Sequence, residues 1–289
     1  MGAQGTRDTT EDAAGAPSVY RALRVERHDA VAEVVLLGPG KGNSMGPDFW
    51  REAPEVFAAL DHDAAVRAVI LRGQGAHFSY GLDLPAMMTQ PHLHFTGENL
   101  AAERTELLDT VLRMQQACSA VAACRKPVIA AVAGWCIGAG LDLIAACDVR
   151  LSSAEARFSL REVKMAIVAD MGSLQRLPPI IGQGNTRELA LTGNDIDAAR
   201  ALAMGLVNEV CETPDAVLAA AHAMAEQIAA NPPLAVQGIK RVLNECQGRT
   251  VEEGLRYVAL WNAAFLQSRD LQEAFAAFVE RRPPHFAGE

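Results

Sequence analysis

Short apolar runs alternate with segments of helical spacing over residues 20–182. The runs predict strands at 20–27, 31–37, 67–72, 127–133 and 149–153. Helical spacing predicts helices at 48–60 and 98–124, and a third helix that leaves a glycine-rich turn near residue 138. Because strands that alternate with helices form a sheet covered by helices, the pattern predicts an α/β layer structure.

After about residue 183 the pattern is helical only. Helices are expected at 187–193, 197–204, 214–230, 234–246, 250–267 and 270–280. Such a tail covers a sheet or builds an oligomer interface. We therefore divide the chain into a disordered leader over 1–18, a core with the site over 19–210 and a helical region over 211–289.

Composition narrows the classes of function. The chain has 289 residues, of which 50% are hydrophobic and 21% charged, as in ordinary globular proteins. The net charge is −9 and no basic block occurs, so neither nucleic acid nor a membrane is a predicted partner. The leader lacks an apolar core and the cysteines form no C-x-x-C pair, which favours free thiols in a cytoplasmic protein.

A glycine-rich turn, Gly138-Ala139-Gly140, follows the strand predicted at 127–133. The free N–H groups of a helix that starts there can hold a phosphate or stabilise an oxyanion. Two alternatives remain open. The turn can be purely structural, or it can belong to a dinucleotide fingerprint, although the third small residue of that fingerprint would fall on Leu143.

A second loop, 75–84, also follows a strand and leads toward a helix. Two such strand ends can each present a backbone N–H to one substrate carbonyl, whereas the loop read alone can be structural. The sequence predicts no metal site, because His92-x-His94 has no cysteine or third ligand nearby.

Asp142, Glu162 and Asp170 are carboxylates flanked by apolar residues. Apolar surroundings disfavour the charged form and raise the pKa of a carboxyl, which suits proton transfer near neutral pH. Simpler interpretations exist. Glu162 can form a surface ion pair with Arg161 or Lys164, and Asp170 can cap a helix that starts near Ser173.

Five segments together resemble the crotonase superfamily, the enoyl-CoA hydratase/isomerase family. Their order and spacing fit from about residue 20 to 286, and they are KGNSMGPDFW (41–50), GAHFSYGLDL (75–84), KPVIAAVAGWCIGAGLDLIAACDVRL (126–151), FSLREVKMAIVADMGSLQRLPPIIG (158–182) and FVERRPPHF (278–286). The resemblance implies a spiral of ββα units with two nearly perpendicular sheets. It also implies a C-terminal helical trimerisation region, and a homotrimer or a hexamer of paired trimers.

The resemblance further implies an acyl-CoA thioester as substrate, with no separate cofactor. The thioester carbonyl would lie between the backbone N–H groups of Tyr80 and Ala139. Family members usually carry Gly where this chain has Ala139. The CoA moiety would lie against two segments, through Lys41, Gly42, Asn43, Ser44, Ser79, Gly81, Leu82, Asp83 and Leu84.

The three carboxylates resemble those of the Δ3,5-Δ2,4-dienoyl-CoA isomerase branch. Hydratases of the family usually have Glu at the positions of Asp142 and Glu162, and Gly at that of Asp170. By this resemblance Glu162 is the base at C2, Asp170 the acid at C6 and Asp142 a supporting polar group. The implied function is double-bond isomerisation in fatty-acid oxidation.

Two other functions stay open. One is an enoyl-CoA hydratase that adds water to a trans-2-enoyl-CoA, in which Asp170 would have no evident task. The other is a non-catalytic acyl-CoA-binding scaffold, against which the three retained carboxylates argue.

Overall fold

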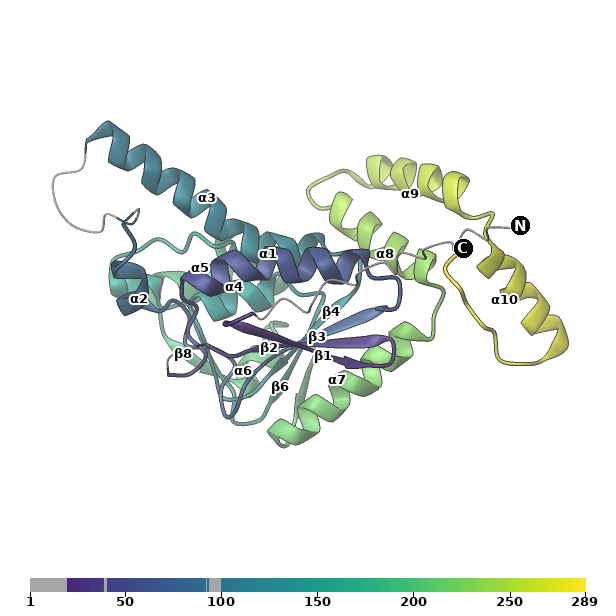
Figure 1. Cartoon of the computed structure of the whole chain (residues 1–289), viewed down its shortest axis with the longest axis horizontal. Coiled ribbons are helices and arrows are strands. Elements are labelled where there is room, and N and C mark those ends of the chain that lie inside the picture. Colours follow the sequence, from purple (N-terminus) through teal and green to yellow (C-terminus); the bar gives the residue numbers. More distant parts are fainter. Residues whose placement is uncertain (1–19, 39–40, 92, 94–99) are drawn as a thin grey trace, which may run out of the picture.

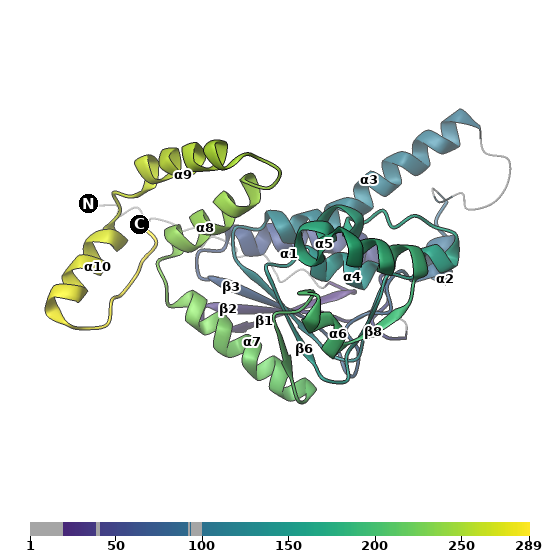
Figure 2. The same cartoon turned by 180° about the vertical axis from the view of Figure 1, so that it is seen from behind.

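The computed structural model describes residues 20–38, 41–91, 93 and 100–289. The predicted leader over 1–18 lies outside the described residues, as do His92 and His94. A twisted sheet lies at the centre, helices cover it, and the last helices extend to one side (Figure 1). Figure 2 shows the same arrangement from behind.

The strands are short and lie mostly in the first two thirds of the chain. They are β1 Leu23–His28, β2 Val31–Leu36, β3 Ala68–Gly73, β4 Val128–Val132, β5 Trp135–Ile137, β6 Val149–Ser153, β7 Arg157–Ser159, β8 Asp195–Asp197 and β9 Glu209–Cys211. The main sheet has the order β1-β2-β3-β4-β6-β9, and a smaller sheet has the order β5-β7-β8. In the main sheet β1 and β2 are antiparallel and the other neighbours are parallel.

The helices connect and cover these strands. They are α1 Pro47–His62, α2 Leu84–Met88, α3 Ala101–Ala123, α4 Ala139–Ala145, the 3₁₀ helix η1 Glu162–Met165, α5 Ser173–Thr192, α6 Ala198–Ala203, α7 Pro214–Ala229, α8 Pro233–Glu245, α9 Val251–Phe265 and α10 Arg269–Glu280. The helices predicted at 48–60 and 98–124 correspond to α1 and α3, whose start falls next to undescribed residues.

The inner strands of the main sheet, β2, β3, β4 and β6, are largely buried on both faces. In β3, Val69 and Leu71 belong to the large core beneath α1 and α3, whereas Ala68 and Ile70 belong to a second core that contains residues of α7. Successive side chains of a strand point to opposite faces, so each apolar run supplies both cores. This explains why the buried strands read as continuous apolar runs in the sequence.

The expectation of a helix-only tail after residue 183 is wrong. The strands β8 and β9 lie within it, and β9 extends the main sheet by pairing with β6. The helix α5 already begins at Ser173, and Gly182, with φ 79° and ψ 158°, interrupts it. Strands of three residues are too short to show a period of two, so the sequence pattern did not reveal them.

The C-terminal helices differ in whether they contact the main sheet. The helix α7 packs on the main sheet, whereas α9 and α10 project beyond it (Figures 1 and 2). Lys240 anchors α8, because its buried ammonium group donates to the Lys126 carbonyl at 3.1 Å and to Asp148 Oδ2 at 2.6 Å. Asp148 Oδ2 also accepts the Val128 N–H at the start of β4.

Replacing Lys240 by methionine tests this anchor. The Asp148 carboxylate would lose its buried cation, so we expect Lys240→Met to lower the free energy of unfolding by about 2–3 kcal/mol. Arg241→Met is the matched control, since the Arg241–Glu245 pair is exposed and exposed pairs contribute roughly 0–1 kcal/mol. Urea denaturation of both variants at pH 7 measures the difference. Equal destabilisation by the two substitutions would contradict the anchor.

Candidate active site

The two glycine-bearing loops meet at one edge of the sheets. Ser79 pairs with Cys136 as in a parallel strand: its N–H donates to the Trp135 carbonyl at 3.0 Å, and its carbonyl accepts the Ile137 N–H at 2.9 Å. A Cβ on Gly81, where φ is +83°, would lie 2.7 Å from the Ile137 carbonyl oxygen. Only glycine fits there, and the two backbones approach closely for that reason.

The predicted oxyanion donors, Ala139 and Tyr80, line the same cavity. Ala139 is the first residue of α4, so its N–H has no partner within the helix. The Tyr80 N–H donates to the Gly42 carbonyl at 2.8 Å. A substrate carbonyl would have to replace Gly42 as the acceptor before Tyr80 could act as the second donor.

The cavity has a volume of about 290 Å³ and an apolar wall. That wall is formed by side chains of α1, α2, α3 and the loop before α2, namely Trp50, Leu82, Leu84, Met87, Leu107, Val111 and Met114. Asp142, Glu162 and Asp170 line the same space. The structure therefore brings together all three carboxylates and both predicted donors in a pocket suited to an apolar chain.

Glu162 is held against the glycine turn. A Cβ on Gly138 would lie 3.0 Å from its Oε1, and its buried Oε2 has no hydrogen-bond partner within the described residues. Burial, reinforced by the charge of Asp142, raises the pKa of Glu162 to about 7. The surface ion-pair interpretation is wrong, because Arg161 binds Asp195 at 2.6 Å instead.

Asp142 is 1% exposed and projects from α4. Its Oδ1 accepts the Ser173 N–H at 2.6 Å, which satisfies one of the free donors at the start of α5. Burial raises the pKa of Asp142 to about 6, although the Ser173 hydrogen bonds oppose the shift. Asp142 therefore supports the site in two ways: it fixes α5 and it helps to keep Glu162 protonated.

Asp170 lies at the exposed side of the cavity, just before α5. Its backbone carbonyl accepts a hydrogen bond from Gln115 Nε2 of α3 at 2.8 Å. Partial removal from water raises the pKa of its carboxyl. The helix-cap interpretation is wrong, because Gly172 is the N-cap of α5 and the carboxylate that accepts a backbone N–H at its start belongs to Asp142.

The residues predicted to contact CoA fall into two groups. Some of their side chains hold the loops together: Asn43 Nδ2 donates to the carbonyls of Gln74, His77 and Phe78, Ser79 Oγ donates to the Asn43 carbonyl, Ser44 Oγ donates to the Lys41 carbonyl, and Asp83 caps α2. The side chains of the second group make no such contacts within the loops. Lys41 is exposed to solvent, and Leu82 and Leu84 line the cavity. Gly81 allows the close approach described above, and a Cβ on Gly42 would lie 2.5 Å from the Tyr80 ring.

Sequence reasoning missed the residues that position the carboxylates. Gln115 holds the Asp170 backbone and Ser173 holds Asp142, but an isolated Gln or Ser carries no signal of such a contact. Leu107, Val111 and Met114 recur at helical spacing in α3 and form part of the cavity wall. That spacing was visible, yet it indicates a packed core equally well.

Comparison with known proteins adds independent findings. The chain matches the family described as enoyl-CoA hydratase/isomerase over residues 26–289. It is 43% identical to the mitochondrial Δ(3,5)-Δ(2,4)-dienoyl-CoA isomerase of Dictyostelium discoideum over 92% of each chain. It is 41% identical to the peroxisomal enzyme of that name from Arabidopsis thaliana, over 93% of this chain and 98% of the relative.

A solved structure confirms the predicted fold. The enoyl-CoA hydratase of Bacillus anthracis superposes with a TM-score of 0.83 at 30% identity, covering 93% of this chain and all of that one. The α/β fold of the crotonase type expected from the sequence is therefore correct.

Among the helices of the described residues, none is both long enough and apolar enough to cross a membrane.

The raised pKa of Glu162 predicts a stability that depends on pH. Its folded-state pKa of about 7 lies above the ordinary value of 4.5, so its contribution to stability is present below about pH 4.5 and is lost as the pH rises to about 7. Glu162→Gln should therefore raise the free energy of unfolding by about 2 kcal/mol at pH 8 and leave it nearly unchanged at pH 4.5.

Denaturation at both pH values measures this effect. Glu55→Gln, an exposed position on α1, is the control and should show no such gain. A Glu162→Gln variant that is less stable than the parent at pH 8 would contradict this. It would show that a favourable partner stabilises the ionised carboxylate in the folded chain.

Proposed function

Because the chain belongs to the enoyl-CoA hydratase/isomerase family, we propose that it converts a 3,5-dienoyl-CoA to the 2,4-dienoyl-CoA. The observation that carries this proposal is the presence of three carboxylates with raised pKa values around one apolar cavity. Asp170 is the distinguishing residue, since hydration needs no carboxyl there. Two relatives at 43% and 41% identity bear the name of this isomerase.

In the proposed mechanism the thioester carbonyl accepts a hydrogen bond from the Ala139 N–H and, in place of the Gly42 carbonyl, a second one from the Tyr80 N–H. These donors stabilise the oxyanion that forms when ionised Glu162 removes a proton from C2. The electron pair of the broken C–H bond enters a conjugated trienolate that extends from the thioester oxygen to C6. Protonated Asp170 then donates its proton to C6, which leaves double bonds at C2=C3 and C4=C5.

The two transfers balance within the site. One proton leaves C2 for Glu162 and one leaves Asp170 for C6, so the site regains its starting state when a proton passes from Glu162 to Asp170. Glu162 has a pKa of about 7 and can therefore accept and release a proton near neutral pH. The scheme consumes no cofactor, and CoA takes part only as a component of the substrate.

The CoA moiety is proposed to lie against residues 41–45 and 79–84. The exposed Lys41 offers the cation there for a phosphate group, while Leu82 and Leu84 lead into the cavity that would hold the acyl chain. The bond between the Tyr80 N–H and the Gly42 carbonyl links this segment to the oxyanion site.

A homotrimer, or a hexamer of paired trimers, is proposed on the basis of the projecting helices. Large apolar side chains on α9 and α10 are mostly solvent-exposed in the single chain: Leu255 by 63%, Leu260 by 67%, Phe275 by 65% and Phe278 by 82%. Exposed apolar surface of this kind marks an interaction surface.

Enoyl-CoA hydration is the second candidate function. Glu162 and Asp142 line the same cavity, and two carboxyl groups there can both accept hydrogen bonds from one water molecule. The non-catalytic scaffold is less well supported. Burying Glu162 Oε2 without a hydrogen bond is unfavourable, and a protein that only bound acyl-CoA would gain nothing from it.

We propose that the reaction belongs to fatty-acid oxidation. The names of the two dienoyl-CoA isomerase relatives place those proteins in mitochondria and peroxisomes. The cytoplasmic location expected for this chain stays a prediction.

The division of labour between Asp170 and Glu162 provides the decisive test. With 3,5-dienoyl-CoA as substrate, Asp170→Asn should lower isomerisation about 10²–10⁴-fold yet retain exchange of the C2 proton with solvent, because the base remains. Glu162→Gln should abolish that exchange. Formation of the conjugated 2,4-dienoyl-CoA is followed by absorbance, and exchange by mass spectrometry.

Asp109→Asn, an exposed position on α3, is the control for these variants and should leave both rates unchanged. Hydration of a 2-enoyl-CoA is measured in parallel. If Asp170→Asn keeps full isomerase activity, or loses hydratase activity instead, the hydratase assignment replaces the isomerase.

The oxyanion donor at Ala139 gives a separate prediction. Proline is tolerated at the first position of a helix and lacks the N–H, so Ala139→Pro should remove one donor while α4 remains folded. We expect turnover to fall about 10²–10³-fold. Ala101→Pro, at the first position of α3, is the matched control. Circular dichroism verifies folding, and unchanged turnover in a folded Ala139→Pro variant would exclude this donor.

A further inference from the structure

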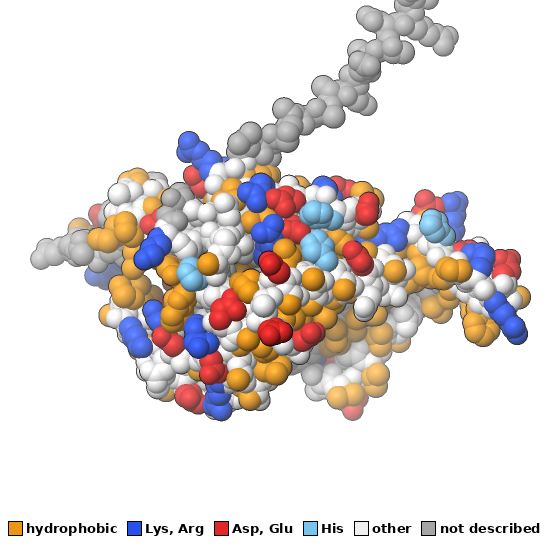
Figure 3. All heavy atoms as spheres, turned by 90° about the horizontal axis from the view of Figure 1, so that it is seen from below, with side chains coloured by type: hydrophobic (Ala, Val, Ile, Leu, Met, Phe, Trp, Pro, Cys, Tyr) orange, Lys and Arg blue, Asp and Glu red, His pale blue; other side chains and the backbone are white. Residues whose placement is uncertain are grey.

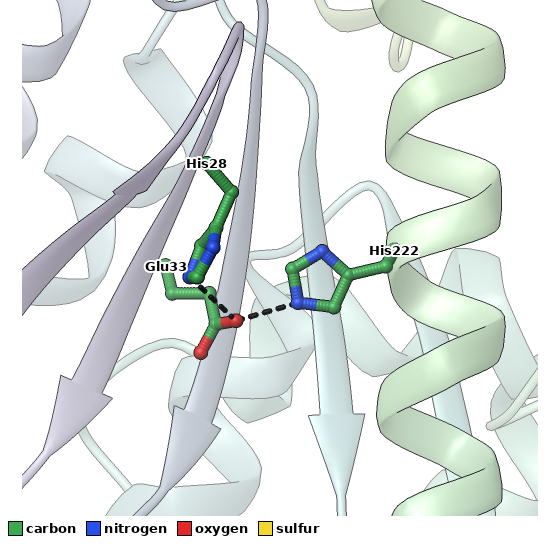
Figure 4. Close-up of side chains that lie close together, drawn as sticks. All are labelled: His28, Glu33 and His222. Atoms are coloured by element: carbon green, nitrogen blue, oxygen red, sulfur yellow. Dashed lines mark hydrogen bonds and ion pairs between the residues drawn. The ribbon is translucent and has the colours of Figure 1, made fainter.

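His28, Glu33 and His222 lie together on the face of the main sheet that α7 covers (Figure 4). His28 ends β1, Glu33 lies in the middle of β2, and His222 projects from α7 toward them. Space-filling atoms show histidine side chains in contact at the surface, among acidic and basic groups (Figure 3). The three residues come from distant parts of the sequence, so only the fold brings them together.

Both imidazoles point at the same oxygen atom. His222 Nε2 lies 2.5 Å and His28 Nε2 lies 3.2 Å from Glu33 Oε1. The rings meet edge to face, with their centroids 5.2 Å apart. One ligand atom from each residue lies within 4.8 Å of the other two. Two nitrogens and one oxygen thus converge on a small space.

The other oxygen of Glu33 is already occupied. Arg72 Nε donates to Glu33 Oε2 at 2.5 Å, and the same guanidinium lies 3.4 Å from Glu26. Arg72 therefore fixes the orientation of the Glu33 carboxylate, and its Oε1 is presented to the histidines.

Solvent reaches the three side chains of the cluster to different extents. The Glu33 side chain is only 3% exposed, that of His222 is 25% exposed and that of His28 is 48% exposed. The three residues contribute nothing to the cavity proposed as the active site. On this face Glu33 stands beside the apolar side chains of Val31 and Ile70, where an apolar residue would pack without the cost of desolvating a charge.

We propose that His28, Glu33 and His222 form a binding site for a divalent transition-metal ion, with Zn²⁺ as the best match. Two imidazole nitrogens and one carboxylate oxygen are a donor set that zinc accepts, with water completing a tetrahedron. The exposed side of His28 provides the open position for that water. Arg72 is the outer partner that orients the carboxylate, a role that such groups commonly have in metal sites.

The bound ion replaces the two hydrogen bonds at Glu33 Oε1 by metal–ligand bonds. Because the ligands belong to β1, β2 and α7, the ion connects the edge of the main sheet to the helix that covers it. Zn²⁺ that binds the folded chain and not the unfolded one must stabilise the fold. The site therefore has a structural role, separate from the proposed isomerisation.

The test uses the full chain, freed of metal with EDTA and dialysed. Isothermal titration with Zn²⁺ at pH 7.5 should show one ion per chain, and thermal unfolding followed by circular dichroism should show a higher midpoint with Zn²⁺ than without it. His28→Gln and His222→Gln should each weaken binding by at least about tenfold and remove the rise in midpoint. His62→Gln on α1 is the control and should bind as the parent does.

Cobalt supplies a second readout. Co²⁺ bound by two nitrogens, an oxygen and water in a tetrahedron should give visible absorption bands that are absent from the His222→Gln variant. Circular dichroism shows whether each variant is folded, and because His28 is half exposed its substitution should not disturb the fold. Zinc binding that is absent in the parent, or that survives both histidine substitutions unchanged, would overturn the proposal.

Discussion

A carboxylate that is removed from water without a counter-ion raises the free energy of the folded state. The proposed site depends on such a carboxylate. Glu162 is in this position, with Oε2 buried and unpaired within the described part of the chain. Its neighbours increase the penalty, because Asp142 adds a negative charge. The folded state therefore favours protonated Glu162, which makes the group a proton carrier near neutral pH.

The surrounding fold keeps Glu162 in this unfavourable position. The 3₁₀ helix η1 places it beside Gly138, whose missing side chain leaves room for the carboxylate. The neighbouring Arg161 could neutralise it but is bound to Asp195, which lies in β8. The short strands β7 and β8 thus affect the chemistry of the site, although they form only a small part of the sheets. They bind the guanidinium of Arg161, the cation next to Glu162 in sequence, through Ser159 and Asp195.

The sequence was sufficient for the α/β class, for the helices α1 and α3 and for choosing three carboxylates that line one cavity, because each depends on local pattern or motif; the roles of these carboxylates stay predictions. It was insufficient where the deciding contact is distant in sequence. The pairing of Arg161 with Asp195 spans 34 residues, and the bond from Gln115 to the Asp170 carbonyl spans 55. Likewise, no sequence pattern shows that the Tyr80 N–H is engaged by Gly42.

The two faces of the main sheet have separate tasks. Val69 and Leu71 of β3 pack into the core shared with α1, α3 and α4, which also carries residues of the cavity. Ala68 and Ile70 pack against α7, on the face that holds the cluster of His28, Glu33 and His222. Because side chains alternate along a strand, changes on the α7 face can alter stability without touching the residues around the carboxylates. The alternation therefore lets one sheet pack against the helices that line the cavity on one side and carry the cluster of His28, Glu33 and His222 on the other.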